Sequence, residues 1–321
     1  MTNKKPAITV LMPAYNVEKY IEEAITSVLQ QTFSDFELVI VNDGSTDMTE
    51  NIIKVFNDPR IILINQPNQG VAAALNKGLK IAKGDYIARF DADDICMPKR
   101  FSIQLGFLLN HPDYIIIGSD VDYIDMHNEF VFSYTSSYYT NEEIQLNKLK
   151  TCPFIHSNVL FRKDAVINVG GYNIHAHTFE DHLLWQKILA TGKGCNLSEK
   201  LLKVRLNPNS ITIDEKWRCR NFHKIKDEAL ARGNITETEG NELLAILKAQ
   251  DIKKIKEGSY YALLSKKYLW NNYQPKKARQ NLKKTLSLKP VDINSYLLLL
   301  LSYMPEKLIQ TIYRLQRSIQ Q

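Results

Sequence analysis

The sequence has few cysteines, glycines and prolines. Its four cysteines lie far apart and form no CxxC pair, which argues against a zinc knuckle or a disulfide framework and favours a reducing cytosol. Only 13 glycines and 11 prolines occur among 321 residues, which excludes collagen-like and low-complexity architecture. With 44% apolar and 24% charged residues, the chain predicts a globular protein of one large or two smaller domains.

Long apolar runs are also lacking. The first run, residues 8–12, ends at Pro13 and is too short for the core of a secretion signal. The most apolar stretch, residues 296–304, is far below the roughly 20 residues that a membrane-spanning helix needs. We therefore expect a cytoplasmic protein without a transmembrane segment.

Charge is distributed unevenly along the chain. Residues 1–214 carry 20 Lys and Arg against 25 Asp and Glu, whereas residues 215–321 carry 21 against 10. A basic region of this kind suits nucleic acid, an anionic membrane surface or an acidic partner, and it is equally typical of a solvated helical face.

The first half of the chain alternates short β-branched runs with amphipathic helical stretches, which predicts βαβ units and a mainly parallel sheet. After about residue 115 the pattern becomes mixed, and from about residue 217 it is helical. We expect a first domain over residues 1–214 and a basic helical region over residues 215–321. The expected strands are residues 8–12, 36–42, 61–65, 86–90, 115–118, 121–124, 131–134 and 157–161.

Three carboxylates, Asp91, Asp93 and Asp94, directly follow the expected strand at residues 86–90. Open α/β sheets bind ligands beyond the carboxyl ends of their strands, and carboxylates crowded there repel one another unless a cation such as Mg²⁺ or Mn²⁺ neutralises them. The alternative is a cluster that caps the N-terminus of a helix beginning at Pro98. The cluster alone leaves both interpretations open.

Two other strand ends carry Pro13 with Tyr15, and Asp43. Tyr15 is suited to stacking on a base and Asp43 to accepting an N–H of that base, so the set points to a nucleotide. Ordinary turn residues and a half-buried ring are the alternatives. The GxGxxG and GxxxxGK[ST] fingerprints are absent from strand–helix junctions, which argues against a dinucleotide dehydrogenase and a P-loop NTPase.

A series of short motifs runs through residues 7–212 in a fixed order. They are PAYN at residues 13–16, VNDGSTD at 41–47, NQG at 68–70, ALNKGL at 74–79, GDYIARFDADD at 84–94, PFIH at 153–156, GGY at 170–172, ED at 180–181 and VR at 204–205. Together these motifs resemble the family 2 glycosyltransferases. The resemblance implies a GT-A fold with a mainly parallel mixed sheet, a nucleotide-sugar donor, a divalent metal and inversion at the anomeric carbon.

Carried over residue by residue, the resemblance places Pro13, Tyr15 and Asp43 around the nucleoside, with Asp43 suited to the N3–H of uracil. UDP-sugars are therefore the favoured donors.

The same resemblance makes Asn76 and Asp91 donor contacts, and Asp93 the DXD ligand for Mn²⁺ or Mg²⁺. Leu75 stands where relatives have Arg, so the diphosphate contact of that Arg is either missing or supplied by Arg89. Asp181 matches the general base, although an acidic pair at residues 180–181 is also typical of a helix N-terminus. The chain departs from the family pattern at Leu75, Asn207 and Cys152, where Arg, His and Asn are usual. We interpret Cys152 as a buried small residue.

We therefore predict an inverting, metal-dependent glycosyltransferase of the hexosyl or N-acetylhexosaminyl class. It would move a sugar from a UDP-sugar to a hydroxyl of a glycan or lipid-linked acceptor in cell-surface polysaccharide synthesis, with no nucleic acid involved. The competing hypotheses are an inactive relative that only binds nucleotide sugars, and a nucleotidyltransferase.

The last hundred residues lie outside the resemblance. Residues 260–290 predict one helical hairpin with tetratricopeptide-like spacing. An apolar face over residues 296–304 is followed by Lys307, Arg314 and Arg317, which suits peripheral contact with an anionic membrane. The alternative is packing of this face against the catalytic domain.

Overall fold

The protein is described by a computed structural model that covers residues 5–208, 218–249 and 252–320. It divides into two compact units. Unit 1 comprises Met1–Val121, Tyr134–Val204 and Arg220–Leu244, and unit 2 comprises Asp122–Ser133, Arg205–Cys219 and Ala245–Gln321. The domain boundary expected near residue 214 falls outside the described residues.

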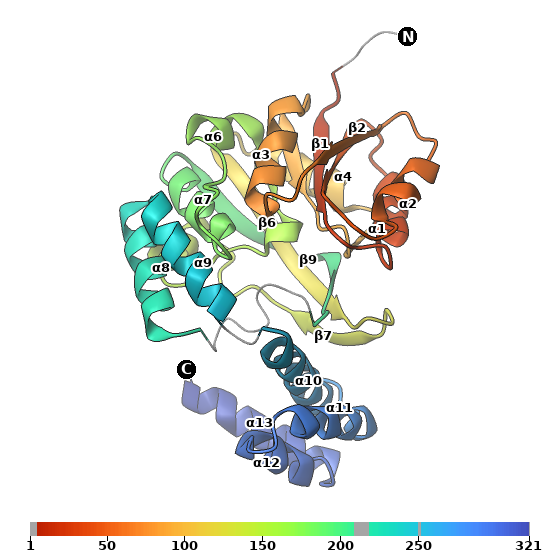
Figure 1. The fold of residues 1–321 in the computed structure, drawn as a ribbon, viewed down its shortest axis with the longest axis vertical. Helices are drawn as coiled ribbons and strands as arrows, with labels where there is room; N and C mark the ends of the chain where they lie inside the picture. The colour runs from red at the N-terminus through yellow and green to blue at the C-terminus, as the bar shows by residue number, and fades with distance from the viewer. Residues whose placement is uncertain (1–4, 209–217, 250–251, 321) are drawn as a thin grey trace. The chain divides into compact units, whose positions relative to one another are not determined.

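A mixed sheet in the order β3-β2-β1-β4-β8-β6-β9-β5 organises unit 1 (Figure 1). The first four of these strands are parallel, whereas β8 runs antiparallel to both β4 and β6, and β5 antiparallel to β9. The predicted mixed, mainly parallel sheet is confirmed in its first half. The strands are β1 (Ile8–Ala14), β2 (Phe36–Asp43), β3 (Ile61–Gln66), β4 (Tyr86–Arg89), β5 (Ile95–Cys96), β6 (Tyr114–Ile124), β8 (Leu160–Arg162) and β9 (Lys193–Arg205).

The parallel strands are buried because helices cover them. Every residue of β2 is buried, as expected for an apolar run covered on both faces, and α3 packs against β1 and β2. The helices of this unit are α1 (Ile21–Leu29), α2 (Thr49–Val55), α3 (Val71–Ile81), α4 (Arg100–Asn110), α5 (Asn141–Asn147), η1 (His156–Asn158), α6 (Lys163–Asn168), α7 (Glu180–Ile188), α8 (Arg220–Arg232) and the first part of α9 (Glu237–Ala249).

Among its described residues, unit 2 combines a β-hairpin with the end of α9 and the helices that follow it. The far end of β6 pairs with β7 (Phe130–Tyr134), and the Tyr268 hydroxyl donates to Asp125 Oδ2 over 2.9 Å. The expected helical hairpin is confirmed by α10 (Ile252–Trp270) packed on α11 (Pro275–Leu288), and α12 (Ile293–Leu301) and α13 (Glu306–Gln320) follow. Across the described ranges, no helix is both long and apolar enough to cross a bilayer.

A glycine without room for a side chain leads the chain into β4. The Gly84 N–H donates to Thr9 Oγ1 over 2.9 Å, and a Cβ at Gly84 would lie 2.5 Å from the Thr9 nitrogen and 2.7 Å from the Ile8 carbonyl carbon. Because these are backbone atoms of β1, they cannot move aside cheaply. This close approach sets the position of β4, and therefore of the carboxylates that follow it.

Gly84→Ala should destabilise the protein by about 1 to 3 kcal/mol, because the new methyl group overlaps the backbone of β1. Gly106→Ala in α4 is the matched control, since nothing lies within 4 Å of its added Cβ. There alanine should be neutral or stabilise by up to about 1 kcal/mol. Urea denaturation of both variants tests this, and equal stabilities would contradict the predicted clash.

Candidate active site

Two strand-end turns are tied together at the carboxyl edge of the parallel strands. The Asn16 N–H donates to Ser45 Oγ over 3.0 Å, and Asn16 Oδ1 accepts from the Thr46 N–H over 2.8 Å. Gly44 adopts φ = +73°, and a Cβ there would lie 2.7 Å from the Asn68 nitrogen. The turn after β2 is thus held against both neighbouring loops, so the residues after β1 and at the end of β2 lie at one edge.

The buried carboxylate of Asp43 accepts several hydrogen bonds at this edge. Its Oδ1 accepts from Gln66 Nε2 over 2.6 Å and from the Gln69 N–H over 2.9 Å, while Oδ2 accepts from the Gly70 N–H over 2.8 Å. A carboxylate has about four acceptor positions, so one on Oδ2 remains for a ligand N–H. The ring of Tyr15, which follows β1, is 48% exposed, and its predicted stacking on a base stays a prediction.

At the end of β4, buried arginines meet the acidic cluster. Arg89 is 3% exposed, and its Nη1 contacts Asp91 Oδ1. Arg100 is fully buried and donates from Nη2 to the carbonyl of Arg89 over 2.8 Å. The charge of Asp94, also buried, acts on both arginines. Arg89 therefore holds Asp91 in place, and its predicted contact with the donor stays a prediction.

The capping interpretation of the acidic cluster is wrong. Helix α4 begins at Arg100, with Lys99 at its N-cap and no side-chain hydrogen bond to that cap. Pro98 precedes the N-cap and is not the first helical residue, because residues 95–96 form β5 instead of leading straight into a helix. The cluster thus belongs to the end of β4 rather than to a helix terminus.

The donor set for a cation at this edge is sparse. Among the described residues, no group of three His, Cys, Asp or Glu side chains is arranged to hold a metal ion. Asp93 is partly exposed, and one hard carboxylate oxygen fits Mg²⁺ or Mn²⁺ when substrate phosphates and water complete the coordination shell. The residues present therefore fit a metal that is bound together with a diphosphate.

Two adjacent acids open α7. Glu180 is 6% exposed, and burial together with the neighbouring Asp181 raises its pKa to about 8. Burial also raises the pKa of Asp181, although its Oδ1 accepts from the His182 N–H over 2.7 Å. Adjacent buried carboxylates resist ionising together, so the pair retains a proton near neutral pH. Asp181 is the more exposed member and therefore the better placed to accept a proton from a substrate.

A neutral aromatic layer lies beside this acid pair. His156 Nε2 is 3.0 Å from the Tyr172 hydroxyl, and its Nδ1 is 4.0 Å from Glu180 Oε1. Burial and the charge of Arg89 hold the pKa of His156 well below its usual range, so the imidazole is neutral and forms no ion pair with Glu180. Both His156 and Tyr172 pack on the fully buried Trp185. The layer keeps the acids in an apolar environment.

Asn76 links α3 to this layer. Its Nδ2 donates to the Tyr172 carbonyl over 2.7 Å, and its Oδ1 accepts from the Tyr172 N–H over 2.9 Å. Gly171 has φ = +73°, and a Cβ there would lie 2.6 Å from Asn76 Oδ1. In the structure Asn76 thus positions the turn at residues 170–172, and its predicted contact with the donor stays a prediction.

Sequence reasoning missed two neighbours of the acid pair. Tyr172 lies in the GGY motif but had no predicted role of its own. Lys226 falls in the predicted basic C-terminal region, although α8 belongs to unit 1. The charge of Lys226 acts on both Asp181 and Cys152, and Cys152 Sγ lies 3.7 Å from Asp181 Oδ2. No motif marks Lys226, since α8 lies beyond the residues that carry the resemblance.

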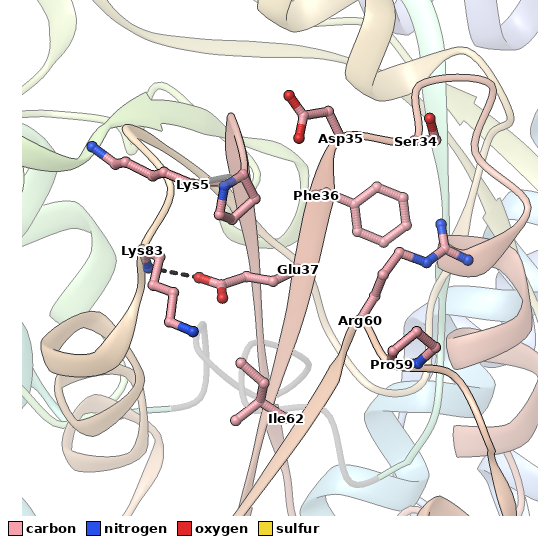
Figure 2. Close-up of a pocket in the computed structure, with 10 residues that line it drawn as sticks. Lys5, Ser34, Asp35, Phe36, Glu37, Pro59, Arg60, Ile62 and Lys83 are labelled. Atoms are coloured by element: carbon pink, nitrogen blue, oxygen red, sulfur yellow. Dashed lines mark hydrogen bonds between the residues drawn. The ribbon is translucent and has the colours of Figure 1, made fainter. Parts of the chain in front are cut away.

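A cavity of about 540 Å³ lies at the opposite edge of the sheet (Figure 2). It is lined at the amino ends of β1, β2 and β3, where Glu37 accepts from the Lys83 N–H over 2.6 Å. Because the acidic residues described above follow the carboxyl ends of the strands, this cavity is separate from the candidate active site.

Comparison with known proteins identifies the class. The family model described as "Glycosyl transferase family 2" matches residues 9–170, and the chain belongs to this family. It is 34% identical over 218 residues to the amylovoran biosynthesis glycosyltransferase AmsE of Erwinia amylovora. The aligned region covers 65% of this chain and 80% of AmsE. The chain is 28% identical over 237 residues to the hyaluronan synthase of Pasteurella multocida, covering 73% of this chain and 24% of that protein.

Solved structures share the fold. S. aureus TarS 1-349, in complex with UDP-GlcNAc, superposes with a TM-score of 0.58 at 17% identity, covering 96% of this chain and 92% of that one. The mannosyltransferase PcManGT from Pyrobaculum calidifontis, in complex with GDP-Man and Mn²⁺, gives 0.52 at 18% identity, covering 97% and 85%. The predicted GT-A-type fold with a helical C-terminal region is confirmed, and the chain is a glycosyltransferase.

Glu180→Gln should flatten the pH dependence of stability. Because the pKa of Glu180 is raised in the folded state, the folded protein binds more protons than the unfolded chain between about pH 5 and about pH 8, and stability falls as pH rises through this window. Over that window the wild type should lose about 1 to 3 kcal/mol more than the variant. Urea denaturation at both ends measures this difference.

Glu142→Gln is the control for this experiment, since Glu142 is an exposed acid in the first turn of α5. Its variant should follow the wild-type pH dependence. Parallel curves for wild type and Glu180→Gln would show that Glu180 is ionised in the folded protein.

Proposed function

We propose that this protein is an inverting, metal-dependent glycosyltransferase that uses a UDP-sugar. The observation that carries the proposal is an electrostatic interaction in unit 1 between the residues at the end of β4 and the acid pair of α7. The charges of Asp91 and Arg89, at the end of β4, both act on Glu180 at the start of α7. A donor-binding edge and a proton-accepting acid pair thus lie within electrostatic reach of each other.

The donor would lie along the carboxyl edge of β1, β2 and β4. Tyr15 would stack on the base, next to Pro13, and Asp43 Oδ2 would accept the N3–H of uracil at its remaining position. Asp91, held by Arg89, would contact ribose or sugar. Nucleotide-sugar complexes of TarS and PcManGT, which share the fold, support a donor of this class.

Asp93 would hold Mn²⁺ or Mg²⁺ against the diphosphate. When bound, the cation would stabilise the negative charge that the leaving diphosphate acquires. The Mn²⁺ in the PcManGT complex supports a divalent ion in this fold.

Asp181 would act as the general base. In a single displacement, the acceptor hydroxyl oxygen bonds to the anomeric carbon while the bond from that carbon to the diphosphate oxygen breaks. The hydroxyl proton passes to the Asp181 carboxylate, and the nucleoside diphosphate leaves. The raised pKa of Asp181 makes it a stronger base than an ordinary aspartate.

The acceptor would be a hydroxyl of a glycan or of a lipid-linked sugar. Relatives named for amylovoran biosynthesis and for hyaluronan synthesis support a place in cell-surface polysaccharide synthesis. The sugar transferred would be a hexose or an N-acetylhexosamine. A lipid-linked acceptor would be met at the cytoplasmic face of the membrane.

Asp93→Ala should abolish Mn²⁺-dependent binding of UDP, because Asp91 is paired with Arg89 and Asp94 is buried, so neither can replace the lost ligand. Calorimetry of UDP with and without Mn²⁺ measures this. Asp113→Ala, which removes an exposed carboxylate paired with Lys193, should bind like the wild type. Unchanged affinity in Asp93→Ala would place the metal elsewhere.

Asp181→Asn should keep UDP affinity and lower turnover by about 10² to 10⁴-fold, the contribution expected of a general base. Asp164→Asn is the matched control, because Asp164 is an exposed aspartate in the first turn of α6. Release of UDP from a panel of UDP-sugars measures turnover. Near-normal release in a folded Asp181→Asn would assign the base to another group, and pyrophosphate release from a triphosphate and a sugar phosphate would favour nucleotidyl transfer instead.

A further inference from the structure

Helix α12 and its C-cap bury two serines, while several of their large apolar side chains are exposed. Its buried positions include Ser295 and, at its C-cap, Ser302, each 1% exposed. Their hydroxyls bond locally, Ser295 Oγ to Asp292 Oδ2 over 2.7 Å and Ser302 Oγ to the Leu299 carbonyl over 2.6 Å. These two serines therefore share the inward side of the helix with partly buried leucines, while another set of large apolar side chains is exposed.

The outward side chains form one continuous stripe. Their spacing of three and four residues puts them on one face of the helix and its C-terminal turn. Leu300, near the middle, is 67% exposed, and a cluster of this size marks an interaction surface rather than scattered surface residues. The α12 stripe consists of Ile293, Tyr296, Leu297, Leu300, Tyr303 and Met304.

The part of the chain that carries the stripe is rich in positive charge. Residues 245–321 carry 15 Lys and Arg against only 4 Asp and Glu. Arg279 of α11 donates to the Ser302 carbonyl over 2.7 Å, and its guanidinium lies 4.5 Å from the centre of the Tyr303 ring. Lys276 and Lys283 are exposed and share the Arg279 face of α11 by helical spacing. A basic face of α11 thus adjoins the end of the stripe.

We propose that the α12 stripe docks the protein on an anionic lipid bilayer. An apolar face flanked by Lys and Arg lies in the headgroup region of such a membrane, with the apolar side chains among the acyl chains and the cations near lipid phosphates. A second copy of this chain fits less well, since two strongly basic surfaces repel each other. Nucleic acid would use the cations and leave the stripe in water.

The purpose we give to membrane docking, access to a lipid-linked acceptor, rests on the proposed function. Membrane binding itself is independent of catalysis. It is therefore measured with vesicles alone, while UDP binding in the presence of Mn²⁺ is measured separately, so failure of one proposal does not imply failure of the other.

The full chain should co-sediment with phosphatidylcholine vesicles that contain phosphatidylglycerol, and bind pure phosphatidylcholine much more weakly. The double variant Leu297→Glu with Leu300→Glu should bind the anionic vesicles at least about tenfold more weakly, because two apolar groups are lost and two negative charges gained. Its matched control is Leu109→Glu with Leu146→Glu, which changes two exposed leucines of unit 1 in the same way. This control should bind like the wild type.

A second pair of variants tests the charges. Lys276→Gln and Lys283→Gln should each weaken binding by about fivefold at low salt, with less effect at high salt, since screening removes the attraction. Lys80→Gln and Lys99→Gln, at exposed lysines of unit 1, are the controls and should change little.

Three results would overturn the proposal. The first is no binding of the wild type to anionic vesicles. The second is full binding by the Leu297→Glu, Leu300→Glu variant. The third is a lower melting temperature or a lost dimer in this variant, without vesicles, since either would show that protein covers the stripe.

Discussion

The burial of two arginines at the end of β4 governs the arrangement of the donor edge. Arg100 is bonded through Nη2 to the carbonyls of Arg89 and Val159, over 2.8 and 3.2 Å, which ties β4 to the segment before β8. A buried guanidinium costs several kcal/mol unless it is paired. Asp91 and Asp94 supply the compensating charge, so the carboxylates after β4 stabilise the fold in addition to any role in binding the donor. The proposed metal ligand, Asp93, lies between them in the sequence.

The acid pair depends on packing rather than on charge pairing. Trp185 contacts the rings of His156 and Tyr172, and His182 Nε2 lies 2.6 Å from the Lys148 carbonyl, so α7 is fixed on two sides. A carboxylate in this setting keeps its direction without a cation bound to it. Its basicity then comes from the apolar surroundings, and a substrate that excludes more water would increase it further.

Much of the parallel half of the sheet could be predicted, because strands buried on both faces are continuous apolar runs bounded by turns. Strand β9, residues 193–205, was missed because exposed polar residues at 198–200 interrupt its apolar pattern. Whether the acidic cluster capped a helix depended on where α4 begins, which no local signal specifies. The influence of Lys226 on Asp181 could not be predicted for another reason. Lys226 lies on α8, and only the tertiary structure shows that α8 belongs to unit 1.

The paired bonds between Asn76 and the Tyr172 backbone join segments about a hundred residues apart in the chain. Gly171 leaves the space that the Asn76 amide occupies, so a larger residue at position 171 would collide with Asn76. When chimaeras are built by exchanging segments between relatives, α3 and the turn at residues 170–172 should therefore come from the same parent. A crossover that separates them could place a larger residue at position 171 against the amide of Asn76.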